Sequence, residues 1–134
     1  MLTQELVLRK FGKDAVEVLL QDYHAFIFYL HTDDAVEAES LASQLMYDIS
    51  MNLANEFLEF NWGTWVLIDS DTAASIGLKP KGGEDKAYYL MGFVTESEGI
   101  QVPKIEAFLA NFIPGEYINF GRRSPYIGGY YGRY

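Results

Sequence analysis

The chain has 134 residues, the length of one domain, and its 49% hydrophobic and 16% aromatic content suffices for a packed core, which excludes global disorder. It contains no cysteine, which excludes disulfide frameworks, cysteine-based zinc sites and thiol nucleophiles. The formal net charge is −9. No apolar run is long enough to cross a membrane and the N-terminus lacks the order of a signal peptide, so we expect a soluble protein that is cytoplasmic at synthesis.

The first expected element is a short amphipathic helix over TQELVLRKF, Thr3–Phe11. Leu6, Val7 and Phe11 share one face of such a helix. Gly12 then ends it, because glycine follows the last helical residue more readily than any other residue type.

The segment Ala15–His31 is ambiguous. Its first half suits a helix, or else a strand over Val16–Gln21 that turns at Asp22-Tyr23. Its second half, Ala25–His31, is rich in aromatic and β-branched residues and predicts a buried strand.

A long helix is the clearest expectation. Thr32, Asp33 and Asp34 supply an N-cap and an acidic first turn, and Asp34 with Glu37 resembles a capping box. Apolar residues then recur at helical spacing as far as Asn61. They are Ala38, Leu41, Ala42, Leu45, Ile49, Leu53 and Phe57.

The second half of the chain predicts two strands around a loop, then a helix and a last strand. The strands are Trp65–Asp69 and Ala87–Thr95, and Ser70–Asp85 between them is a polar loop. The helix begins near Pro103, is apolar at Ile105, Phe108, Leu109 and Phe112, and stops at Pro114-Gly115. Glu116–Phe120 is the last expected strand.

From Ala25 onward the expected order is strand, helix, strand, strand, helix, strand. This order resembles the split βαβ of ferredoxin-like folds. We therefore expect one α+β domain over residues 1–120, with an antiparallel sheet and helices on one face. An extended C-terminal arm, 121–134, follows it.

Candidate chemistry is sparse. His24 and His31 are the only histidines, and residues seven apart on a strand point to opposite faces, so a shared metal is not expected. KPKGGEDK lacks the order of a phosphate-binding loop, and no serine has the setting of a hydrolase nucleophile. We expect no enzyme activity, no cofactor and no metal.

The aromatic strands FIFYL and AYYLMGFV make the order similar to that of RNA-recognition motifs, which present strand aromatics to bases. AYYLMGFV lacks the basic residue and glycines that open the third-strand signature of those motifs. Phosphate contacts also need lysines and arginines, which the acidic body does not supply. Direct binding of nucleic acid is therefore not expected.

The charge layout is polarised. No lysine or arginine lies between Lys13 and Lys79, whereas the charged side chains after Glu116 are all arginines. The acidic interval is either a solubilising surface or a face that docks a basic partner. The candidate acidic face is Asp33, Asp34, Glu37 and Glu39.

The C-terminal sequence GRRSPYIGGYYGRY interleaves tyrosines and arginines with glycines. It suits a nucleic-acid arm, a disordered tail, a tail folded on its own domain, or a strap that reaches a second subunit. Fourteen residues extend about 45 Å, which exceeds the domain diameter of about 36 Å, so the segment can reach a second subunit. Tyrosine and arginine are also enriched at interface cores. We prefer the strap. Its candidate partner-binding residues are Arg122, Arg123, Tyr126, Tyr130, Tyr131, Arg133 and Tyr134.

The sequence therefore predicts a non-enzymatic protein–protein interaction subunit of a larger ordered assembly. A virion neck, tail or capsid-associated structural protein is one such setting. The expected partners are other protein subunits, of the same or another chain, and not a membrane. The alternative is an acidic inhibitor or immunity-type protein that blocks a nucleic-acid-binding protein by imitating nucleic acid.

Overall fold

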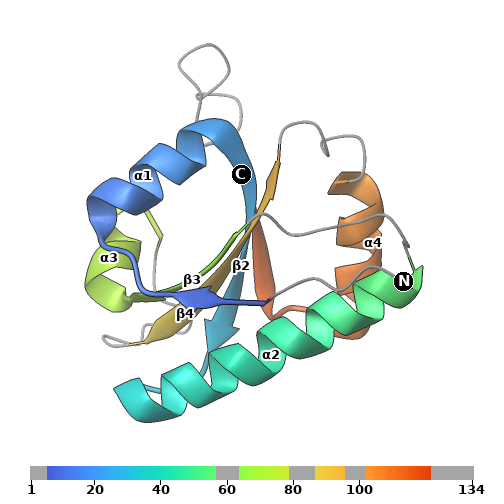
Figure 1. The fold of residues 1–134 in the computed structure, drawn as a ribbon, viewed down its shortest axis with the longest axis horizontal. Coiled ribbons are helices and arrows are strands. Elements are labelled where there is room, and N and C mark those ends of the chain that lie inside the picture. Colours follow the sequence, from blue (N-terminus) through green and yellow to red (C-terminus); the bar gives the residue numbers. More distant parts are fainter. Residues whose placement is uncertain (1–5, 57–63, 79–86, 96–101, 122–134) are drawn as a thin grey trace.

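The computed structural model describes residues 6–56, 64–78, 87–95 and 102–121. Within these ranges the chain is an α+β protein with four helices and a five-stranded mixed sheet. In chain order the elements are β1 (Leu8–Arg9), α1 (Lys13–Asp22), β2 (Tyr23–Leu30), α2 (Ala35–Glu56), β3 (Thr64–Asp69), α3 (Ser70–Ser75), β4 (Tyr88–Thr95), α4 (Val102–Phe112) and β5 (Tyr117–Gly121). Figure 1 shows the sheet between two layers of helices.

The strand order in the sheet is β1-β3-β4-β2-β5. The pairs β3–β4, β4–β2 and β2–β5 are antiparallel, but β1 runs parallel to β3, with Leu8 opposite Trp65. The expectation of an antiparallel sheet is therefore wrong at this edge, and a ferredoxin-like order is not confirmed for the sheet as a whole.

The predicted N-terminal helix is wrong over its described part. Leu8–Arg9 is a strand, Leu6 and Leu8 pack on the core, and Val7 between them is exposed. This alternation has the period of a strand, and the parallel pairing with β3 supplies hydrogen bonds that the sequence did not reveal. Gly12 precedes α1 instead of ending a helix, because its carbonyl accepts the bond from the Val16 amide.

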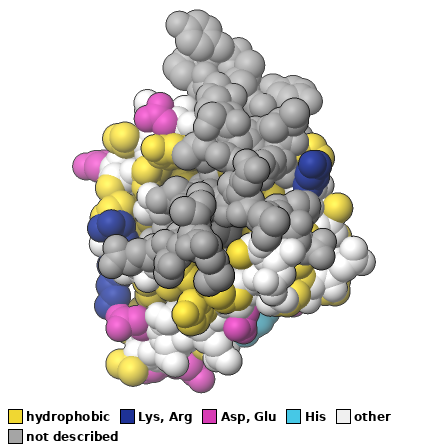
Figure 2. Space-filling model, turned by 45° about the vertical axis from the view of Figure 1, so that its right-hand side comes forward, with side chains coloured by type: hydrophobic (Ala, Val, Ile, Leu, Met, Phe, Trp, Pro, Cys, Tyr) yellow, Lys and Arg dark blue, Asp and Glu magenta, His cyan; other side chains and the backbone are white. Residues whose placement is uncertain are grey.

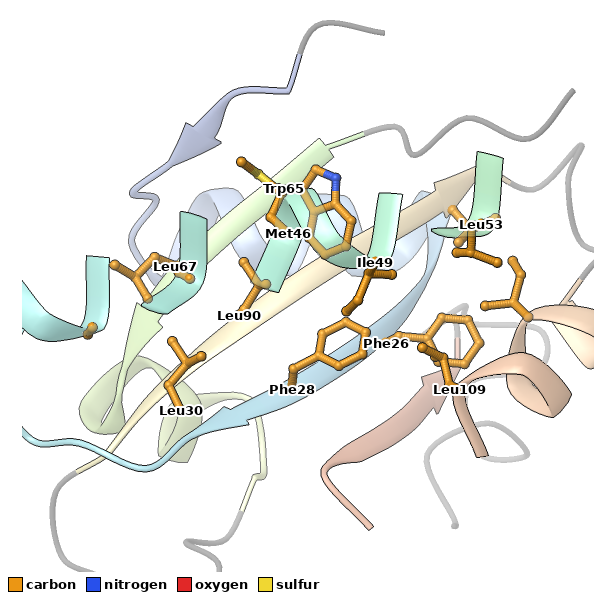
Figure 3. Packing of buried hydrophobic residues seen from close by; sticks show 14 residues of the cluster. Phe26, Phe28, Leu30, Met46, Ile49, Leu53, Trp65, Leu67, Leu90 and Leu109 are labelled. Carbon is orange, nitrogen blue, oxygen red and sulfur yellow. The ribbon is translucent and has the colours of Figure 1, made fainter. Parts of the chain in front are cut away.

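Helices cover both faces of the sheet, so the prediction of helices on one face is also wrong. Phe26 and Phe28 of β2 point into a core beneath α2 and α4, which Figure 3 shows from close by. Ala25 and Ile27 point into a second core beneath α1 and α3. A strand buried on both faces reads as a continuous apolar run, and FIFYL is such a run.

The remaining elements follow the sequence closely. The predicted strands correspond to β2, β3, β4 and β5, and the predicted helices to α2 and α4. The ambiguous segment Val16–Gln21 is helical, since it lies within α1. The predicted loop Ser70–Asp85 is wrong at its start, where α3 begins with the Thr72 amide donating to the Asp69 carboxylate at 2.9 Å. Residues 57–61 of the predicted long helix and 79–85 of this loop lie outside the described residues.

Gly115 makes the turn from α4 into β5. Its φ of 78° is a left-handed value that glycine adopts without strain, which explains the stop at Pro114-Gly115. Gly121 ends β5, and the predicted arm residues 122–134 lie outside the described part of the chain. The division into a domain and an arm therefore stays a prediction. The described part of the chain contains no helix with the length and apolarity that crossing a bilayer requires.

Candidate functional site

The start of α2 is fixed by the residues that the sequence singled out. The Glu37 amide donates to the Asp34 carboxylate at 2.7 Å, and the Asp34 amide donates to the Thr32 hydroxyl at 3.1 Å. The Thr32 hydroxyl in turn donates to the Glu37 carboxylate. Asp34 is therefore the N-cap of α2, as predicted. In a capping box the Glu37 carboxylate would accept from the Asp34 amide, but here it accepts from the Thr32 hydroxyl.

The candidate acidic face has a structural role at three of its four positions. Asp34 caps α2, the Glu37 carboxylate accepts a hydrogen bond from the Thr32 hydroxyl, and Glu39 forms an exposed ion pair with Lys10. Asp33 is exposed before the helix. A role of these carboxylates in docking a basic partner stays a prediction.

The outer side of α2 carries an apolar stripe that the sequence analysis did not single out. Val36, Tyr47 and Met51 are 79%, 56% and 44% exposed. The steps from Val36 to Tyr47 and from Tyr47 to Met51 are each close to a whole number of helical turns, so the three side chains share one face. Their face is opposite to the one that buries Ile49 and Leu53 in the core.

A cavity of about 350 Å³ lies beside this stripe, between α2 and the end of β2. We call it the α2–β2 pocket. Leu30, Leu41 and Leu45 give it apolar walls, while Gln44, Asp48 and His31 stand at its exposed margin. The full lining is Tyr29, Leu30, His31, Leu41, Gln44, Leu45 and Asp48.

The electrostatic character of the α2–β2 pocket is acidic. Asp48 is its one carboxylate, and its lining includes no lysine or arginine. His31 is partnered by Glu116 of the neighbouring segment before β5, and its ring stacks on Tyr29 with centroids 6.3 Å apart. Figure 2 shows hydrophobic side chains reaching the surface beside acidic ones, with Lys and Arg at the margins of the face in view.

The two histidines do not share a site. His24 contacts the Asn119 side chain at one end of β2, and His31 contacts Glu116 beyond the other end. Seven residues of strand separate them, about 23 Å. In the ranges that the structure describes, no three His, Asp or Glu side chains lie close enough together to hold a metal ion.

A second cavity, of about 330 Å³, lies where the parallel strands β1 and β3 end. Its charged lining residues are Lys10 and Asp69. Lys10 pairs with Glu39, and Asp69 accepts the Thr72 amide at the start of α3. Both side chains are thus engaged in contacts that belong to the fold.

The predicted arm residues Arg122, Arg123, Tyr126, Tyr130, Tyr131, Arg133 and Tyr134 all lie outside the described residues. Their role stays a prediction. The stripe and the α2–β2 pocket were missed in the sequence analysis, although the spacing of Val36, Tyr47 and Met51 on the polar side of a periodic helix is a readable signal.

No family model, no curated protein and no solved structure matches this chain. The geometry of the described residues and the chemistry of the sequence therefore carry the functional argument. Among the described features, the stripe on α2 and the adjoining α2–β2 pocket have the character of a docking surface.

Proposed function

We propose that this protein is a non-enzymatic subunit of a larger ordered assembly, joined to a second copy of itself through α2. A virion neck, tail or capsid-associated structure is one setting that needs such small interaction subunits. The observation that carries the proposal is the exposed stripe of Val36, Tyr47 and Met51.

The stripe has the composition of an interface. Tyrosine and methionine are enriched where proteins meet, because they bury a large apolar area and adapt to the partner's shape. The stripe residues are uncharged, and the helix surface between Val36 and Tyr47 includes the small side chains of Ser40 and Ser43. Contact here therefore desolvates few charges, which are the costly groups to bury.

The α2–β2 pocket extends the same surface. Gln44 and Asp48 lie on the side of α2 between the stripe and the pocket walls Leu41 and Leu45. A partner that covers the stripe therefore also meets a concave apolar site with polar groups at its margin. Binding sites commonly combine these features.

We also propose that the elements from β2 to β5 form a ferredoxin-like unit to which β1, α1 and α3 are added. The antiparallel order β3-β4-β2-β5 and the shared core beneath α2 and α4 support this view. Nuclear Overhauser contacts that join Ile27 to both Ile118 and Met91 are the expected result. Pairing of β5 with any strand other than β2 would contradict it.

The test of the interaction surface is a double substitution, Tyr47→Asp with Met51→Asp, followed by sedimentation velocity. Two buried carboxylates would oppose contact through α2, so we expect the variant to sediment as a single chain at concentrations where the wild type associates. Both side chains are exposed, so the helix itself should be preserved and its circular dichroism unchanged.

The matched control is Val18→Asp. Val18 is an exposed apolar side chain of α1, 59% accessible, on the opposite helical layer. We expect this variant to associate like the wild type. Equal association of the α2 variant and the wild type would refute the α2 interface.

A further inference from the structure

We propose that the α2–β2 pocket of one copy receives the tyrosine-rich C-terminal segment, 122–134, of a second copy. The inference rests on the proposed self-association through α2 and names the segment that occupies the concave part of that surface. The tyrosines and arginines at the end of the sequence would thus have a binding site, the α2–β2 pocket of a second copy.

The pocket matches an aromatic side chain with a polar tip. Leu30, Leu41 and Leu45 form apolar walls, and Gln44 and Asp48 place hydrogen-bonding groups at the exposed margin. A tyrosine ring buries its body in such a site while its hydroxyl reaches the polar margin. The cavity of about 350 Å³ is of the size that holds a ring together with adjoining backbone.

The charges of the two surfaces are complementary. The segment carries Arg122, Arg123 and Arg133 and no acidic side chain. Asp48 lies at the pocket, and the ion pairs among the described residues do not include it. No lysine or arginine occurs in the sequence between Lys13 and Lys79, so α2 itself carries no basic side chain that would repel a basic segment.

The direction of β5 favours insertion of the C-terminal segment into the pocket of a second copy over insertion into the pocket of its own chain. Gly121 pairs with Ala25, whereas the pocket lies at the Tyr29–His31 end of β2. The chain therefore leaves the sheet about 17 Å from its own pocket, heading away from it. Thirteen residues extend about 43 Å, so the segment is long enough to reach a neighbouring molecule, whereas entering its own pocket would require the chain to reverse its direction after Gly121.

Tyr130 and Tyr131 are the expected anchors. Adjacent residues of an extended segment point to opposite sides, so one ring enters the pocket while the other packs on the α2 surface next to it. Arginine contacts at an exposed margin mainly speed association and weaken with salt. The tyrosines should therefore account for most of the affinity.

A complementation experiment tests this inference on the full-length chain. The donor variant carries Tyr130→Ala with Tyr131→Ala. The acceptor variant carries Gln44→Trp with Asp48→Lys, two exposed positions whose replacement obstructs the pocket without altering the core. We expect each variant alone to associate with a dissociation constant at least about tenfold higher than the wild type.

The decisive measurement is made on a mixture of the two variants. The donor variant retains intact pockets and the acceptor variant retains intact C-terminal segments, so an equimolar mixture should form a mixed species by light scattering at concentrations where neither variant associates alone. Asp14→Lys, on α1, is the control for charge and should associate as the wild type does. A mixture that remains single chains would overturn the inference, since it means that the segment does not bind a second copy.

The outcomes also separate this inference from the proposed function. The donor and acceptor variants could associate as the wild type does, while Tyr47→Asp with Met51→Asp does not. This result would refute the C-terminal segment as the occupant of the pocket and would support the α2 interface. If the wild type itself never associates, both proposals fail together.

Discussion

Tyr117 joins β5 to the core beneath α2 and α4. Its ring lies 6.3 Å from the ring centroids of both Phe26 and Phe28, and its hydroxyl donates to the Glu106 carbonyl of α4 at 3.3 Å. Burial raises the pKa of Tyr117 above its ordinary value of 10.0, and the nearby Glu106 carboxylate raises it further. Ionising this ring in the folded protein is therefore unfavourable.

The first prediction is an alkaline loss of stability that depends on Tyr117. Because the folded-state pKa is above the unfolded value, the contribution is complete below about pH 10 and is lost as the pH rises through the folded pKa. Urea unfolding at several pH values on both sides of 10 should show the free energy of unfolding fall as the pH rises. The Tyr117→Phe variant should show a smaller fall over the same pH range. Tyr47→Phe, on exposed α2, is the control. An unchanged slope in Tyr117→Phe would disprove this.

Among single residues, those with local roles were predictable from sequence. Asp34 and Glu37 were identified because capping depends on spacing within one turn of helix. Tyr117 and the α2–β2 pocket depend on contacts between segments far apart in the chain. Leu30 and Leu45 meet only when the sheet is formed, so no local pattern could bring them together.

At the scale of elements, α1 and α3 form the layer that covers the sheet face opposite α2 and α4. Val16 and Leu20 are fully buried against the sheet face that α2 and α4 leave uncovered. They lie one helical turn apart, so α1 packs by a single apolar edge while Val18 faces solvent.

The second prediction concerns this packing. Leu20→Ala should lower the free energy of unfolding by about 2–5 kcal/mol, because it leaves a cavity between α1 and the sheet. Val18→Ala, two residues away on the exposed side, should change it by less than about 0.5 kcal/mol. Chemical unfolding monitored by circular dichroism measures both. Similar values for the two variants would mean that α1 does not cover the sheet.

The short elements were the ones that sequence alone did not reveal. α3 has six residues and β1 has two, and elements of this length are stabilised by tertiary contact more than by intrinsic propensity. The apolar runs of β2 and β4 did indicate helices on both faces of the sheet. In a sheet with one solvent-exposed face, apolar and polar residues alternate along each strand. The long periodic helix α2 needed no such context.

For the whole molecule, the charge layout bears on the choice between assembly and inhibition by nucleic-acid mimicry. A mimic depends on acidic side chains that are free to meet a basic partner. Here Asp34 caps α2, Glu37 accepts a hydrogen bond from Thr32, and Glu39 pairs with Lys10. The acidic face is therefore partly committed to the fold.

The third prediction uses the two acidic positions, Asp33 and Glu39, that take no part in the hydrogen bonds at the start of α2. Asp33→Lys with Glu39→Lys should change the dissociation constant of self-association by less than about threefold, since exposed charges of this kind contribute little. Measurements at low and high salt separate a screening effect from lost contacts. Loss of all association in this variant, with α2 and the C-terminal segment intact, would instead favour the acidic-inhibitor alternative.

The mass of the wild-type protein in solution tests self-association most directly. A single chain has a mass of 15.2 kDa. Light scattering over a wide concentration range should give a mass above this value that rises toward a whole multiple, because association through α2 follows mass action. A mass of 15.2 kDa at every concentration would contradict the proposal that this protein is a self-assembling subunit.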